Sequence, residues 1–167
     1  CLGHEFVMGG VLGVIAGCSH RVVTQKTRIV MPEVTIALFP DVGGTWFLHH
    51  MPGKSGLFLA LTGASINAAD AIYTGIADRF IDSERKEEAI EQLYRQEWVV
   101  DVDANHALVR SVLRPLTQSS VEPCPGGQVE PHLATINALR DGAEIQDGHY
   151  NITSHKTDND ELHTGGQ

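Results

Sequence analysis

Cysteines, basic residues and long apolar runs are all scarce in this chain. Its three cysteines, Cys1, Cys18 and Cys124, lie far apart and outside any C-x-x-C arrangement. They therefore predict neither a disulfide framework nor a structural zinc site, and they fit a reducing compartment. The longest apolar region, residues 6–18, is interrupted by four glycines and has no basic segment before it. This region predicts neither a membrane span nor a signal peptide.

Positive charge is low overall. Lysine and arginine number 12 against 21 aspartates and glutamates, which gives a net charge of -9. Nucleic acids and anionic membranes are bound through a positive electrostatic potential, so we expect neither as a partner. A local basic patch that binds a phosphate-bearing ligand remains compatible with this composition.

The chain nevertheless has the composition of a folded protein, because 167 residues with 42% hydrophobic content can bury one real core. We divide it into a core segment at residues 1–81, a helical region at 82–140 and a polar tail at 141–167. The tail is expected to be mobile by composition. No internal repeat is evident.

Spacing and turn residues predict the elements of the core segment. Gly9, Gly13 and Gly17 recur every four residues, which predicts a short buried helix. Two β-branched runs, residues 21–24 and 27–31, flank a polar turn and predict strands. Further helices are predicted at residues 45–50, at 54–61, after the cap residue Asn67, along the apolar stripe Ile90, Leu93, Tyr94 and Trp98, and at 132–140.

The segment from residue 28 to 44, RIVMPEVTIALFPDVGG, places two carboxylates eight positions apart around a β-type run. Glu33 follows Pro32 at a strand end, and Asp41 precedes Gly43 at the expected start of a helix. Such a pair is a candidate for acid/base or nucleophilic chemistry. Spacing alone favours a simpler interpretation, a solvated carboxylate and a helix cap.

Other motifs carry less chemistry. The pair Gly9-Gly10 before a helix could present N–H groups to an oxyanion or a phosphate, although close helix packing is the commoner reason for such glycines. Residues 53–55, Gly-Lys-Ser, are not a P-loop, because Leu48 occupies the position of the first required glycine. His49 and His50 diverge by about 100° on a helix and do not suit one metal ion.

The residues V-M-G-G at 7–10, Gly13 and the segment HRVVTQKTRIVMPEVTIALFPDVGGTWFL resemble the crotonase, or enoyl-CoA hydratase/isomerase, superfamily. The resemblance continues through LTGASINAADAIYTGIADRFI to Ile81 and is strongest to the branch that hydrolyses 3-hydroxyisobutyryl-CoA. It implies an α/β fold in which ββα units form a spiral. Only part of that fold is present, so the chain is expected to be a partial member.

The resemblance also implies roles for individual residues. Glu33 matches the catalytic glutamate, Asp41 a second acidic residue at the reacting end of the substrate, and Gly10, with Gly9, the oxyanion hole. Hydratases carry a further catalytic glutamate at the position of Gly13 and a small residue at that of Asp41. The present pattern is that of the hydrolase. Val11, in the third position of the usual glycine run, and Glu5 depart from the family pattern.

The implied function is acyl-CoA thioester hydrolysis, with 3-hydroxyisobutyryl-CoA of valine degradation as substrate. Coenzyme A is part of that substrate, so no separate cofactor and no metal are expected. Self-association into a homo-oligomer and a location in the cytoplasm or the mitochondrial matrix also follow from the resemblance. The alternatives are an enoyl-CoA hydratase or isomerase and a truncated, non-catalytic protein with the same fold.

Overall fold

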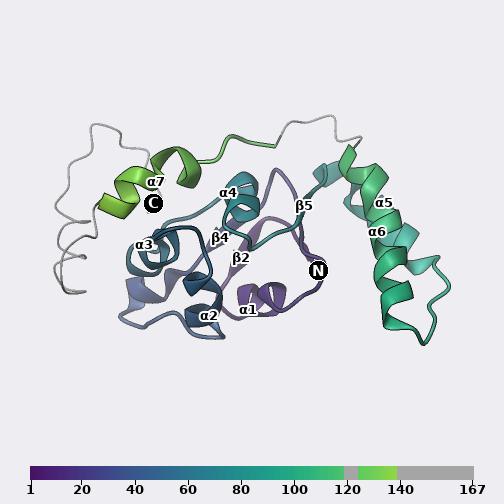
Figure 1. The fold of residues 1–167 in the computed structure, drawn as a ribbon, viewed down its shortest axis with the longest axis horizontal. Helices are drawn as coiled ribbons and strands as arrows, with labels where there is room; N and C mark the ends of the chain where they lie inside the picture. The colour runs from purple at the N-terminus through teal and green to yellow at the C-terminus, as the bar shows by residue number, and fades with distance from the viewer. Residues whose placement is uncertain (119–123, 139–167) are drawn as a thin grey trace.

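The structure is a computed structural model that describes residues 1–118 and 124–138 (Figure 1). Within these ranges the elements, in chain order, are β1 (Leu2–Gly3), β2 (Phe6–Met8), α1 (Gly10–Ala16), β3 (Val22–Val23), β4 (Arg28–Val30), the 3-10 helix η1 (Pro32–Ile36), α2 (Gly44–His49), α3 (Ser55–Thr62), α4 (Ala68–Tyr73), β5 (Arg79–Phe80), the 3-10 helix η2 (Ser83–Arg85), α5 (Lys86–Tyr94), α6 (Val102–Gln118) and α7 (Val129–Ala138). The predicted tail, residues 141–167, lies outside the described residues.

The described strands form two small parallel sheets. One has the order β1-β3-β5, with Leu2 opposite Val22 and Val22 opposite Arg79. The other pairs β2 with β4, with Val7 opposite Ile29. Parallel strands need a crossover connection, and α1 lies in the connections from β1 to β3 and from β2 to β4, while α2 to α4 lie in the connection from β3 to β5.

The two strands predicted around a polar turn are confirmed. Thr27 donates its N–H to the carbonyl of Thr24 at 3.0 Å, and the Thr27 hydroxyl donates to the carbonyl of Gly3 at 2.8 Å. Both threonines are fully buried. The turn does not make a hairpin, since β3 and β4 continue into different sheets.

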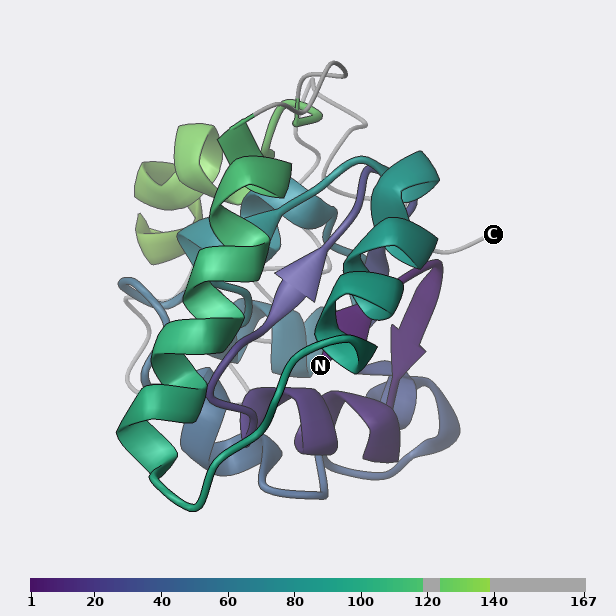
Figure 2. The ribbon, with the colours of Figure 1, turned by 90° about the vertical axis from the view of Figure 1, so that its right-hand side faces the viewer.

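Buried apolar side chains gather in two clusters. The larger lies among α1, the strands β2 and β4, and α2 to α4, and α7 completes it through Val129 and Ile136. The smaller lies under α5 and α6 and consists of Val22, Ile81, Ala89, Val112, Leu113 and Leu116. Figure 2 views the molecule from this second side, where α5 and α6 run side by side in opposite directions.

Several predicted helices are present close to their expected bounds, as α1, α2, α3 and α7. The cap at Asn67 is also confirmed, because its side-chain oxygen accepts the N–H of Asp70 at 3.1 Å. Asp70 has a role that spacing did not indicate. Its buried carboxylate accepts the N–H groups of Gln128 and Val129 at 2.7 and 2.8 Å and so caps the start of α7.

The β-type run predicted between Glu33 and Asp41 is wrong. Residues 32–36 form η1, because Pro32 has the fixed backbone torsion that suits the first position of a helix. The helix ends at Ala37, which has a φ of 59°. The helix cap proposed for Asp41 is also wrong, since Gly43 precedes α2 and no side chain caps it.

The predicted apolar stripe of Ile90, Leu93, Tyr94 and Trp98 is only partly buried. Tyr94 is 84% exposed, and Trp98 lies beyond the end of α5 and is also exposed, so neither belongs to the core. Ala89 is the buried residue of this helix. The following helix, α6, lies in the predicted helical region at 82–140, although its bounds were not predicted, and it buries Val112, Leu113 and Leu116 from its second half.

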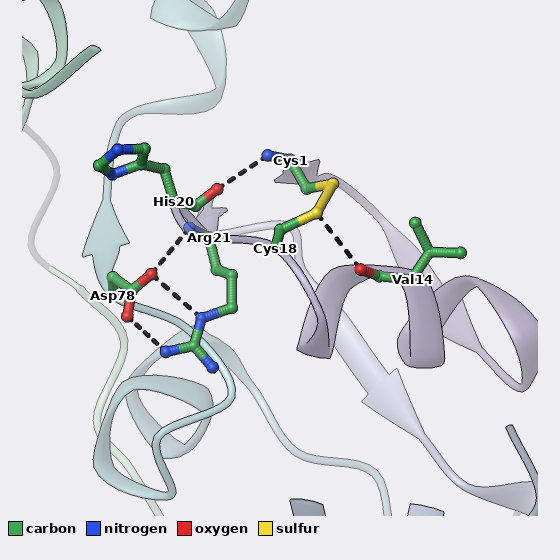
Figure 3. The surroundings of a disulfide bond; sticks show 6 residues. All are labelled: Cys1, Val14, Cys18, His20, Arg21 and Asp78. Carbon is green, nitrogen blue, oxygen red and sulfur yellow. Dashed lines mark hydrogen bonds and ion pairs between the residues drawn. A yellow bond between two sulfur atoms is a disulfide. The ribbon is translucent and has the colours of Figure 1, made fainter. Parts of the chain in front are cut away.

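A disulfide joins Cys1 to Cys18 (Figure 3). The Cα atoms of the two residues lie 6.2 Å apart, within the usual range for such bonds. It ties the start of β1 to the end of α1. The spacing of the cysteines does not indicate this pair, and a disulfide runs against the expectation of a reducing compartment.

An ion pair lies beside the disulfide (Figure 3). The guanidinium of Arg21 contacts the carboxylate of Asp78 at 2.6 Å, and the backbone N–H of Arg21 donates to the same group at 2.8 Å. Burial raises the pKa of Asp78, but the hydrogen bonds and charge of Arg21 outweigh burial and lower this pKa below its usual value.

Candidate active site

Glu33 is a buried carboxylate without a hydrogen-bond partner for one of its oxygens. It lies in the first turn of η1 and is 6% exposed. Its Oε1 lies 3.7 Å from the point where a Cβ on Gly9 would be, and its Oε2 has no hydrogen-bond partner. Buried polar groups are normally satisfied, so an orphaned carboxylate oxygen beside a glycine indicates a site built for a ligand.

The glycine pair lies at the start of α1, next to this carboxylate. Gly9 has a φ of 50°, a conformation that favours glycine and allows the chain to turn sharply from β2 into the helix. The carbonyl of Gly9 accepts the N–H groups of Leu12 and Gly13 at 3.0 and 3.3 Å. The earlier N–H groups of α1 have no intrahelical acceptor. Gly10 is exposed, and no atom lies within 4 Å of the position of an added Cβ.

The loop that carries Asp41 packs against the same helix. A Cβ on Gly13 would lie 2.5 Å from the carbonyl oxygen of Val42 and 2.9 Å from its Cβ, which no real structure tolerates without movement. Gly13 therefore has no space for a side chain. Asp41 itself is exposed, and its carbonyl accepts the N–H of Gly44 at 2.6 Å.

Val42 is a residue of this site that sequence reasoning missed. Its φ is 42°, in the left-handed region that a β-branched residue rarely adopts. Strained backbone of this kind gathers at functional sites, where the surrounding structure holds it in place. The only sequence signal was its position between Asp41 and a glycine pair, which does not by itself indicate a strained residue.

Exposed apolar side chains follow Glu33 along the chain and flank Asp41. The segment between Glu33 and Gly43 exposes Ile36, Leu38, Phe39 and Val42 by 46 to 76%, and the neighbouring Val11 of α1 is 58% exposed. Contiguous exposed apolar residues are typical of a surface that binds a ligand or another part of a protein. This surface is suited to contact with an apolar group.

The structure thus brings Glu33, Gly9 and Gly10 together from separate segments and places the loop of Asp41 on α1 through Val42. Among the described residues, no group of three or more histidine, cysteine or acidic side chains could hold a metal ion. No described helix combines the length and the apolar character that crossing a membrane requires. His49 and His50 are exposed.

A family model described as "Enoyl-CoA hydratase/isomerase" matches residues 1–164 of this chain. The curated 3-hydroxyisobutyryl-CoA hydrolase of human mitochondria is 48% identical over 82 residues, which are 49% of this chain and 21% of the human protein. The protein of the same name from Danio rerio is 49% identical over 80 residues, or 48% of this chain and 21% of the fish protein. The matched part is therefore about a fifth of the length of these relatives.

Two solved structures are similar over most of the chain. A carnitinyl-CoA dehydratase from Mycobacterium thermoresistibile has a TM-score of 0.75 and 33% identity, over 94% of this chain and 42% of that protein. An enoyl-CoA hydratase from Rhodobacter sphaeroides 2.4.1 has a TM-score of 0.67 and 31% identity, over 92% of this chain and 40% of the hydratase.

Proposed function

We propose that this chain, which belongs to the enoyl-CoA hydratase/isomerase family, carries the catalytic carboxylates of an acyl-CoA thioester hydrolase. The proposed substrate is 3-hydroxyisobutyryl-CoA, an intermediate of valine degradation. The fold is the α/β fold of the crotonase type, and the chain holds part of it. The observation that carries the proposal is the contact of Gly13 with Val42, beside a buried Glu33.

This contact favours hydrolysis over hydration. By resemblance, a hydratase places its second catalytic glutamate at the position of Gly13. Here the carbonyl of Val42 lies 2.5 Å from where the Cβ of such a residue would start. The loop that brings Asp41 to α1 therefore takes the space that the hydratase carboxylate requires, which supports a site with Glu33 and Asp41 as its acidic residues.

Thioester hydrolysis develops negative charge on the carbonyl oxygen, and preorganised N–H donors stabilise it. We assign Gly10 as one such donor, because the N–H groups at the start of α1 have no intrahelical acceptor. Glu33 then removes a proton from the attacking water, or attacks the carbonyl carbon itself and is released by water. If Glu33 acts as a base, the proton that it takes from water passes to the sulfur as the carbon–sulfur bond breaks. If Glu33 attacks, the thiolate of coenzyme A leaves first and takes its proton from the water that then hydrolyses the acyl–glutamate anhydride.

Asp41 is proposed to bind the 3-hydroxyl group of the substrate or to move a proton. Its carboxylate is exposed on the loop that follows the apolar segment, where it can meet the polar end of an acyl chain. The apolar residues Ile36, Leu38 and Phe39 would then contact the methyl-bearing carbon skeleton.

The test of the proposal is the rate at which the complete protein releases coenzyme A from 3-hydroxyisobutyryl-CoA. General acid/base catalysis contributes about 100-fold or more to a rate, so Glu33→Gln should lower kcat/KM by at least that factor. The matched control is Glu97→Gln, which removes an exposed carboxylate outside the site and should leave the rate unchanged. A normal thioesterase rate in Glu33→Gln contradicts the assignment.

The second candidate is an enoyl-CoA hydratase or isomerase, and the observation that favours it is the likeness to a dehydratase and a hydratase over more than nine-tenths of the chain. Hydration of crotonyl-CoA without hydrolysis of 3-hydroxyisobutyryl-CoA would select it. The third is a non-catalytic member of the family, which fits the small part of the relatives that the chain matches. It is selected if neither substrate reacts and coenzyme A does not bind.

Self-association and location are proposed on the same family grounds. Sedimentation of the purified protein would measure whether it forms a homo-oligomer. The vertebrate hydrolases are named as mitochondrial, which supports the mitochondrial matrix over the cytoplasm. The disulfide is the contrary observation, and counting free thiols with and without reduction measures whether Cys1 and Cys18 are bonded in the purified protein.

A further inference from the structure

A cavity lies between β5 and one face of α6, away from the candidate active site. Its volume is about 660 Å³, and its walls are Arg79 of β5 and the α6 residues Ala107, Arg110, Ser111, Arg114, Thr117 and Gln118. The α6 residues recur every three or four positions and therefore form a single stripe along the helix. The opposite side of α6 packs into the smaller core.

The cavity is strongly basic in a chain that is acidic overall. Of the seven lining residues that the structure describes, three are arginines and none is acidic, whereas the net charge of the chain is -9. Arg79, Arg110 and Arg114 form no ion pair with any described residue. Other arginines do have such partners, because Arg21 pairs with Asp78 and Arg95 with Glu91.

The positive charge of these arginines also affects the pKa of a neighbouring histidine, His20. His20 lies against His106 of α6, with 3.1 Å between their ring nitrogens. Burial lowers the pKa of His20, and so do His106 and the charges of Arg110 and Arg79, against the opposing charge of Asp78. The positive field of the arginines therefore extends beyond the cavity walls.

We propose that this cavity binds the phosphate groups of an organic phosphate of about nucleotide size. Guanidinium groups present rigid, forked donors that match phosphate oxygens, and three arginines line this cavity without an ion pair to any described residue. The volume lies within the range of about 300–1,000 Å³ that is usual for small-molecule sites. A bound phosphate relieves the mutual repulsion of the arginines, which no described side chain relieves.

This site is separate from the candidate active site. None of its lining residues belongs to α1, η1 or the loop of Asp41, and it borders the smaller core while Gly9 and Glu33 border the larger. The proposal therefore does not rest on the proposed function. Two sources could supply the phosphate: a free phosphate-bearing ligand, or the nucleotide end of an acyl-CoA molecule.

The experiment is calorimetric titration of the full chain with inorganic pyrophosphate and with ADP. We expect saturable binding that Arg110→Gln and Arg114→Gln each weaken by about tenfold or more, because each removes a charge-assisted hydrogen bond. Arg110→Lys keeps the charge but loses the fork, so it should weaken binding less than Arg110→Gln. Arg95→Gln is the matched control on α5, and it should change the affinity less than twofold.

Two results overturn the proposal: no saturable binding of either probe, or an equal loss of affinity in Arg95→Gln and Arg114→Gln. Thermal melts of each variant show that it is folded before it is titrated. Glu33→Gln should bind both probes normally, so a failure of the proposed function leaves this test intact. Titration of coenzyme A at saturating pyrophosphate separates the two sources. If pyrophosphate weakens the binding of coenzyme A, the cavity binds the nucleotide end of the acyl-CoA. If coenzyme A binds equally well with pyrophosphate present, the cavity binds another phosphate-bearing ligand.

Discussion

Replacing the buried carboxylate of Glu33 with an amide should stabilise the protein. The residue is 6% exposed and its Oε2 has no hydrogen-bond partner, so folding removes this oxygen from water without compensation. A buried unsatisfied polar group costs about 1–3 kcal/mol, and a charged one costs more. Glu33→Gln retains the shape of the side chain but removes its charge.

The expected gain in the free energy of unfolding is about 1 kcal/mol, since the glutamine amide is also incompletely satisfied. For a chain of this size, that corresponds to a rise in Tm of about 2–4 °C. Urea denaturation and thermal melts at pH 7 measure both quantities. The same variant is expected to lose hydrolase activity, so stability and activity should change in opposite directions.

Asp41→Asn is the matched control, because it is the same carboxylate-to-amide change at an exposed position. Both variants remove one negative charge from a chain of net charge -9, so any general relief of repulsion is shared. Asp41→Asn should alter stability by less than about 0.5 kcal/mol. The reasoning is refuted if Glu33→Gln is less stable than the unmodified protein or gains no more than Asp41→Asn.

Two further predictions concern packing and pH. In Gly56→Ala the new Cβ would lie 1.9 Å from the carbonyl oxygen of Leu48, and overpacking of this kind outweighs the better helix propensity of alanine, so we expect a loss of about 2 kcal/mol in urea denaturation. Gly10→Ala, with nothing within 4 Å, should be neutral, and an equal loss there would contradict this account. The pKa of Asp78 is lowered by its ion pair, so its contribution to stability is present above the unfolded pKa of about 3.9 and is lost as the pH falls through the lower folded pKa. Asp78→Asn should therefore be less stable than the unmodified protein at pH 7 and equally stable near pH 2, and a difference that is constant with pH would count against it.

Sequence patterns predicted the helices and caps that are determined by residues close together in the sequence. The four-residue spacing of Gly9, Gly13 and Gly17 indicated α1, and the side chain of Asn67 caps α4 as expected. The segment after Pro32 was misjudged, because its apolar residues resemble a strand while proline favours a helical start. The bounds of α6 were not predicted within the helical region, because Pro115 lies inside this helix and its buried residues are confined to its second half.

Contacts between distant segments could not be obtained from spacing. The capping of α7 by Asp70, the bond between Cys1 and Cys18, and the cavity between Arg79 and α6 all join residues far apart in the sequence. Family resemblance singled out Glu33 and Gly10, but it gave no hint of the unpartnered oxygen that makes Glu33 unusual. A single sequence does not record which distant backbone atoms meet.

The contact between Gly13 and Val42 bears on how such a site can evolve. A glutamate at position 13 requires the loop at position 42 to move away, because the carbonyl of Val42 lies where its side chain would begin. The effect of a glutamate at position 13 therefore depends on the conformation of the loop at position 42, and the effect of a change in that loop depends on the residue at position 13. The two positions are expected to be epistatic. An evolutionary path between glycine and glutamate at position 13 would have to change helix and loop together, and ancestors with only one change would carry a packing defect at the candidate site.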